Sequence, residues 1–230
     1  MPHLLLLPGM MCDQRLFAPQ IAAFSDVVTI EVPALSDFAT VRELATDVLD
    51  RAPASFMLAG LSMGGIVAME IVRQASERVS KLALLDTNPL AETVDRQRAR
   101  EPQIERVRAG GLIDVMRDEL KPNYLADGPV KPGVMKVCME MACTLGAAVF
   151  ERQSRALQTR SDQCDTLCNI RIPTLVLCGE HDRLCPPERH AMMHAMVPGS
   201  VLEIVAGAGH LPTLEQPEKT NAALARWMEE

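Results

Sequence analysis

Three side chains with complementary chemistry follow one another along the chain. Ser62 is the centre of "GLSMG" (60–64), a G-x-S-x-G pattern that is typical of a serine exposed on a sharp strand-to-helix turn. Asp182 follows in "GEHDRLCPP" and His210 in "GAGHLPTLE". A serine hydroxyl becomes a strong nucleophile when a neighbouring base takes its proton and a third group orients that base. These three residue types therefore predict nucleophilic catalysis, provided that the fold brings them together.

Each of the three residues comes directly after, or within a few residues of, a short aliphatic run. The runs are continuous instead of alternating, which is typical of strands in a parallel sheet covered on both faces. Six such runs occur, at residues 4–7, 27–32, 55–61, 81–86, 174–179 and 201–206. Ser62, Asp182 and His210 follow the third, fifth and sixth of them. We therefore expect all three side chains on loops at the carboxyl ends of strands.

Helical patterns alternate with these runs, with apolar residues spaced three and four apart at 15–24, 41–51, 64–74, 188–196 and 220–228. Alternating strands and helices predict a doubly wound α/β fold. The alternation stops between Asp86 and Ile172, where helix-like stretches are interrupted by proline and glycine. We interpret this region as a helical lid over the sheet. The sequence thus predicts a core of residues 1–86 and 173–230 with an inserted cap of residues 87–172.

Together, "GLSMGG", "GEHDRLCPP" and "GAGHLPTLEQPE" resemble the nucleophile elbow, acid loop and histidine loop of the α/β-hydrolase superfamily. The resemblance is to its compact, lidded, esterase-like branch, and it spans nearly the whole chain, least of all the cap. It implies a mostly parallel six-stranded sheet with helices on both faces. It also implies Ser62 as the nucleophile, His210 as general base and then acid, and Asp182 as the orienting carboxylate.

The family resemblance also implies an oxyanion hole made of two backbone amides. One is the amide of Met63, after the nucleophile, and the other lies in the loop after the first strand. In "LLLLPGMMCD" the amide of Met10 is our choice and that of Met11 the alternative. Pro8 stands where the family commonly has histidine, so the hydrogen bonds inside this loop can differ.

Asp86 is a second candidate for the acid, because it ends the fourth apolar run and some members of the fold supply the acid there. We prefer Asp182, whose surrounding sequence is the commoner one. Asp86 has an alternative role in bonding the amides of the following turn.

Four residues are predicted to line the substrate pocket: Met11, Asn88, Met135 and Met139. The two last belong to the methionine-rich stretch 134–150, which can form an adaptable apolar wall for an acyl group. Ordinary helix packing within the cap explains the same composition.

Composition limits the possible partners. A net charge of −7 and a pI near 5.3 argue against nucleic acid or an anionic membrane as the main partner. The first residues show neither a basic leader nor a long apolar span, so we expect a cytoplasmic protein. The seven cysteines are expected to be free thiols, and we expect no metal and no organic cofactor. His190 and His194 are read as a solvated helical face, because no third metal ligand is recognisable nearby.

The function predicted from these patterns is hydrolysis of a small to medium carboxylic ester through an acyl-enzyme intermediate. The same three residues would serve thioester hydrolysis, carbon-carbon bond hydrolysis or acyl transfer. A ligand-binding receptor that keeps the hydrolase pocket is the alternative outside enzymology. The sequence leaves the oligomeric state undetermined.

Overall fold

The fold is built on a six-stranded sheet in which every neighbouring pair of strands is parallel. The computed structural model describes all residues from 1 to 230. The strand order is β2-β1-β3-β4-β5-β6. The strands are β1 (His3–Leu7), β2 (Thr29–Glu31), β3 (Phe56–Leu61), β4 (Val79–Leu85), β5 (Thr174–Gly179) and β6 (Val201–Val205). Each of the six apolar runs thus forms a strand, and the predicted fold class is confirmed.

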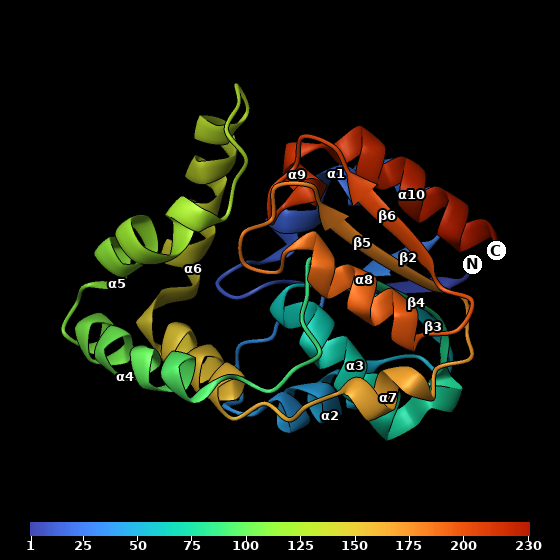
Figure 1. Ribbon diagram of the computed structural model, residues 1–230, viewed down its shortest axis with the longest axis horizontal. Helices are drawn as coiled ribbons and strands as arrows, with labels where there is room; N and C mark the ends of the chain where they lie inside the picture. The colour runs from blue at the N-terminus through green and yellow to red at the C-terminus, as the bar shows by residue number, and fades with distance from the viewer.

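Continuous aliphatic strands are required because both faces of this sheet are covered. Leu5 and Leu7 of β1 belong to one hydrophobic core, whereas Leu4 and Leu6 point to the other. On the first face lie α2 (Val41–Arg51), α3 (Met63–Ala75) and α8 (Pro187–Met196), and on the second α1 (Ala18–Phe24), α9 (Pro212–Glu215) and α10 (Pro217–Glu229) (Figure 1). The apolar pattern of each strand therefore serves two cores at once.

Four helices lie between β4 and β5: α4 (Val94–Arg108), α5 (Leu112–Asp114), α6 (Lys131–Gln158) and α7 (Cys164–Cys168). The first three form a helical lobe, residues 94–158, beside the sheet on the left of Figure 1. In contrast, α7 packs against α3 and α8, although it too falls within the predicted cap of residues 87–172. The division into core and cap stays a prediction. Short single-turn helices occur at 14–17, 76–78 and 121–123, and a π-helical turn at 115–120.

Gly146 interrupts α6, the longest helix. Its backbone is not helical, with φ 78° and ψ 177°, so α6 consists of two helices joined at a kink. By length and composition alone α6 is apolar enough to cross a membrane. The kink leaves residues 131–145 and 147–158 as separate helices, and each is shorter than the roughly 20 residues that a membrane-spanning helix needs.

Candidate active site

Ser62 lies on the turn between β3 and α3, as the G-x-S-x-G pattern predicts. Its φ of 56° is in the left-handed region, a conformation that costs a non-glycine residue about 1–3 kcal/mol. The flanking glycines make the turn possible. A Cβ atom on Gly60 would lie 2.3 Å from the carbonyl oxygen of Gly64, and one on Gly64 would lie 2.0 Å from that of Leu7. The turn therefore excludes any side chain at these two positions.

The structure brings the three predicted residues into one hydrogen-bonded line. The Nε2 atom of His210 lies 2.9 Å from the Oγ atom of Ser62, and its Nδ1 atom lies 2.8 Å from Oδ2 of Asp182. The other carboxylate oxygen of Asp182 accepts hydrogen bonds from the amides of Leu184 at 2.8 Å and Cys185 at 3.0 Å. Asp182 and His210 are buried, so the bond between them is protected from water, whereas Ser62 is half-buried.

The charges in this line determine which nitrogen of His210 carries the proton. Burial acts to raise the pKa of Asp182, but His210 and the two amide donors keep that pKa below its usual range. An ionised carboxylate can only accept hydrogen bonds. The Nδ1 atom of His210 therefore carries the proton, and Nε2 is left to accept the hydroxyl proton of Ser62.

Two amides near Ser62 are free to stabilise an oxyanion. Met63 is the first residue of α3, where a backbone N–H has no partner within the helix. The amide of Met10 makes no hydrogen bond either. In contrast, the amide of Met11 donates to Oε1 of Gln153 at 2.8 Å. The structure therefore favours Met10 over Met11 as the second donor.

Asp86 forms no hydrogen bond with His210. Its Oδ1 atom accepts a hydrogen bond from the amide of Gly179 at 2.9 Å, and its Oδ2 atom has no partner. The residue is completely buried. Burial, together with the negative charge of Asp182, raises the pKa of Asp86 well above its usual range. Asp86 is thus a buried carboxyl group whose neutral form is favoured by its surroundings, and of the two candidates only Asp182 is hydrogen-bonded to His210.

The substitution Asp86→Asn is expected to stabilise the protein increasingly as the pH rises. Because the folded pKa of Asp86 is raised, its contribution to stability is complete below the unfolded pKa near 3.8 and is lost as the pH rises towards the folded pKa. Asparagine does not titrate and can still accept from Gly179. Thermal melts of wild type and variant at pH 5 and pH 8 should show a larger gain in Tm at pH 8. For a chain of this length, a gain of 1 kcal/mol in the free energy of unfolding corresponds to about 2–4 °C in Tm. An equal change at both pH values would contradict a raised pKa.

Thr87 bonds the backbone of Ser62, and His190 in turn bonds Thr87. The hydroxyl of Thr87 donates to the carbonyl oxygen of Ser62 at 2.7 Å, and its amide donates to Nε2 of His190 at 3.1 Å. Burial lowers the pKa of His190 to about 4, so the ring is neutral and can accept this bond at neutral pH. The expectation that His190 belongs to a solvated face is therefore wrong, because its side chain is fully buried.

Glu215 organises the loop of His210, a role that the sequence analysis missed. Its two carboxylate oxygens accept three backbone N–H groups, those of Gly209 at 3.0 Å, Leu211 at 3.0 Å and Ala126 at 2.7 Å. The first two flank His210 and the third belongs to the helical lobe. One buried carboxylate thus fixes the histidine loop to the lobe.

Tyr124, also in the helical lobe, contacts His210 directly. Its carbonyl oxygen accepts the amide of His210 at 2.6 Å, and its ring meets the imidazole edge-on with the centroids 5.3 Å apart. The lobe therefore helps to position the histidine.

The substitution Glu215→Gln is expected to lower kcat for ester hydrolysis about tenfold or more, because a bond from an amide to a charged acceptor is worth about 1.5–3 kcal/mol. An amide NH2 group cannot accept, so at least one of the three backbone donors loses its partner. We expect KM to change less, because Glu215 does not line the substrate cavity. Steady-state kinetics measure this. The exposed Glu218→Gln is the matched control, and equal kcat values for both variants would refute the role of Glu215.

A cavity of about 240 Å³ opens beside Ser62 and His210. Asn88 lines it, as predicted. The other three residues predicted for the pocket do not: Met11 is fully buried, and Met135 and Met139 pack against the hydrophobic cores. This cavity therefore gives no support to these three residues, because apolar helix packing and an apolar pocket wall have the same sequence pattern.

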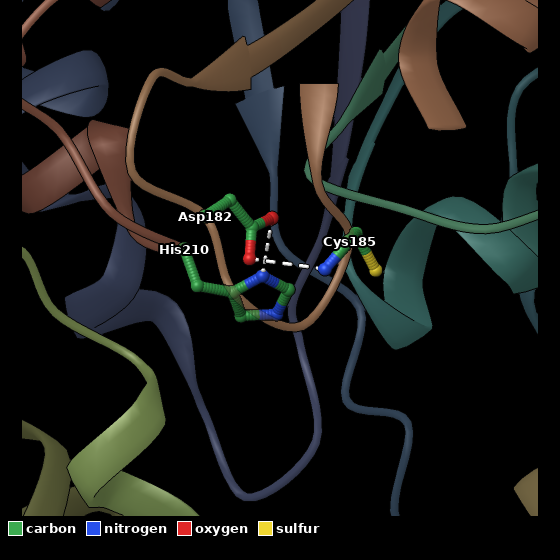
Figure 2. A group of neighbouring side chains, drawn as sticks. All are labelled: Asp182, Cys185 and His210. Carbon is green, nitrogen blue, oxygen red and sulfur yellow. Dashed lines mark hydrogen bonds and ion pairs between the residues drawn. The ribbon is translucent and has the colours of Figure 1, made fainter. Parts of the chain in front are cut away.

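Asp182, His210 and Cys185 offer potential metal-ligand atoms within 4.8 Å of one another. Figure 2 shows the carboxylate of Asp182 joined by hydrogen bonds both to the ring of His210 and to the backbone nitrogen of Cys185. Both carboxylate oxygens are thus already hydrogen-bonded. Burial and the charge of Asp182 raise the pKa of the Cys185 thiol, which opposes the thiolate form that binds metals. The carboxylate of Asp182 is therefore placed to orient His210, and the three groups together do not suit a metal ion.

Comparisons with known proteins agree with this fold. The model of the alpha/beta hydrolase family matches residues 4–223. A thermophilic esterase from Thermogutta terrifontis, solved with malate bound, has a TM-score of 0.90 at 26% identity, covering 100% of this chain and 90% of that one. The pimeloyl-[acyl-carrier protein] methyl ester esterase of Photobacterium profundum is 26% identical over 185 residues, 78% of this chain and 73% of that protein. A putative 2-succinyl-6-hydroxy-2,4-cyclohexadiene-1-carboxylate synthase of Bacillus subtilis is 30% identical over 173 residues, 70% of this chain and 61% of that protein.

Proposed function

This chain belongs to the alpha/beta hydrolase family. We propose that it hydrolyses carboxylic esters through an acyl-enzyme intermediate. One observation carries the proposal: a hydroxyl, an imidazole and a buried carboxylate are joined by bonds of 2.9 and 2.8 Å beside a cavity. The names of the similar esterases agree with it.

The first half of the reaction forms the acyl-enzyme. The Oγ atom of Ser62 attacks the carbonyl carbon while its proton passes to Nε2 of His210. The carbonyl oxygen becomes an oxyanion, and the free amides of Met10 and Met63 stabilise it. As the carbonyl reforms, the bond to the alkoxy group breaks, and this group leaves as the alcohol with the proton from His210.

The second half releases the acid. Water enters where the alcohol was, His210 takes one of its protons, and the hydroxide oxygen attacks the acyl carbon. The tetrahedral intermediate collapses, and Ser62 regains its proton from His210. Asp182 keeps the imidazole in the required orientation and stabilises its charged form in both halves.

Steady-state hydrolysis of p-nitrophenyl esters from acetate to decanoate tests this proposal. We expect multiple turnover, with an optimum among the short to medium chains because the cavity holds about 240 Å³. The absence of turnover on every ester would refute ester hydrolysis. Labelling of Ser62 by an organophosphorus probe in that case would point to thioester or carbon-carbon bond cleavage, acyl transfer or a receptor.

A further inference from the structure

The wall of the cavity beside Ser62 is unusually basic for so acidic a chain. Three of its residues are arginines, Arg96, Arg100 and Arg160, and one is acidic, Glu92. The whole chain carries a net charge of −7, so this cavity differs in sign from the average surface. A local excess of positive charge next to a reactive serine calls for a physical explanation.

Glu92 pairs with two of the three arginines. Its carboxylate is completely buried, forms an ion pair with Arg100, and lies 3.3 Å from Nη1 of Arg160. Arg160 also donates to the carbonyl oxygen of Leu90 at 2.9 Å. The side chains of Arg100 and Arg160 are only 16% and 6% exposed, so their guanidinium groups are fixed in place.

Arg96 is different, because it forms no ion pair and no side-chain hydrogen bond although it lines the same cavity. The cavity wall therefore holds three guanidinium groups and only one carboxylate. These groups are close enough to repel one another: burial lowers the pKa of Arg160, Glu92 acts to raise it, and the charges of Arg100 and Arg96 lower it further. An anion entering the cavity would relieve this repulsion.

We infer that the ester cleaved at Ser62 carries an anionic oxygen group, a carboxylate or a phosphate, that binds against Arg96, Arg100 and Arg160. The inference rests on the ester hydrolysis proposed above. Guanidinium groups bind both kinds of anion through paired N–H donors. The rest of the wall is apolar enough for a hydrocarbon linker between the anion and the ester: Met10, Met63, Ile66, Leu120, Leu157 and Leu184.

A purely structural role is the competing explanation for two of the arginines. Arg100 belongs to α4, Arg160 follows α6, and Glu92 precedes α4, so their ion pairs also tie the helical lobe together. Arg96 separates the two explanations. Because it has no partner within the protein, its replacement removes a charge from the cavity without breaking an ion pair.

The test compares three methyl esters of equal chain length that end in a carboxylate, a phosphate monoester or a neutral carboxamide. We expect wild type to show a kcat/KM about tenfold or more higher for an anionic ester than for the carboxamide, because charge-assisted hydrogen bonds are roughly twice as strong as neutral ones. The better of the two anionic esters identifies the group. Arg96→Gln should reduce this preference about fivefold, chiefly through KM, since Arg96 is exposed and partly screened by solvent.

Arg98→Gln is the matched control, because Arg98 is an exposed residue of the same helix that does not line the cavity. It should keep the wild-type preference. Equal kcat/KM values for all three esters in wild type would overturn the inference while ester hydrolysis stands. An equal loss of preference in both variants would also overturn it, because the effect would then come from overall charge. No turnover of any ester, including the p-nitrophenyl series, would refute the proposed function and the inference with it.

Discussion

Replacing Ser62 with alanine is expected to lower kcat for ester hydrolysis about a millionfold, the loss typical of removing the nucleophile of such a triad. The Oγ atom of Ser62 is the only group of the line that can form the acyl bond, since His210 and Asp182 lie behind it. Steady-state hydrolysis of the preferred p-nitrophenyl ester by both proteins measures the effect. The small rate that remains would come from substrate binding and the oxyanion-hole amides.

The fold should tolerate Ser62→Ala, so a loss of activity in this variant would not be caused by unfolding. Alanine keeps the backbone bonds of the turn, including the carbonyl that accepts from Thr87. An unchanged melting temperature together with lost activity would place the effect in the chemistry. Because triad residues act as a unit, adding His210→Ala should lower the rate little further. A rate near wild type in Ser62→Ala would refute the assignment of the nucleophile.

The parts of the site that the sequence predicted are those that depend on local backbone structure. A strand, a sharp glycine-flanked turn and a helix are encoded within residues 55–75, so Ser62 could be placed from its neighbours alone. Asp182 and His210 follow β5 and β6, and parallel strands bring their carboxyl ends to one edge. The continuous apolar runs predicted a mostly parallel sheet, since each strand contributes to two cores, and in the structure every pair of neighbouring strands is parallel.

The parts that the sequence missed depend on contacts between distant segments. Glu215 accepts the amide of Ala126, 89 residues away, and Gln153 accepts that of Met11 across 142 residues. Nothing in the local pattern around an acidic or amide side chain indicates such a partner. The same holds for His190, whose spacing to His194 looks like one helical face although its ring is buried against Thr87.

Two of these missed residues, Glu215 and Gln153, share a role, because they connect the helical lobe to the loops that carry the chemistry. Tyr124 and Ala126 of the lobe bond the histidine loop, and Gln153 bonds the loop of Met10 and Met11. The same lobe supplies Arg96 and Arg100 to the cavity wall. A change in the lobe can therefore alter both substrate preference and the position of His210.

Asp182→Asn is expected to lower kcat about ten-thousandfold, the loss seen when the acid of a serine triad is replaced by its amide. The two amide donors of Leu184 and Cys185 require an oxygen at their position, so the NH2 group of the asparagine must face Nδ1 of His210. An NH2 group donates and cannot accept. The imidazole is then forced to carry its proton on Nε2, where it can no longer accept the proton of Ser62.

Asp86→Asn is the matched control for this prediction, since it makes the same chemical change in a neighbouring buried carboxyl group that does not bond His210. We expect its kcat to stay within a few-fold of wild type, while its melting temperature rises at pH 8 for the reason given above. Measuring both variants on one ester decides between the two candidate acids. If Asp86→Asn lost activity and Asp182→Asn kept it, the 2.8 Å bond between Asp182 and His210 would not be the one that orients the base.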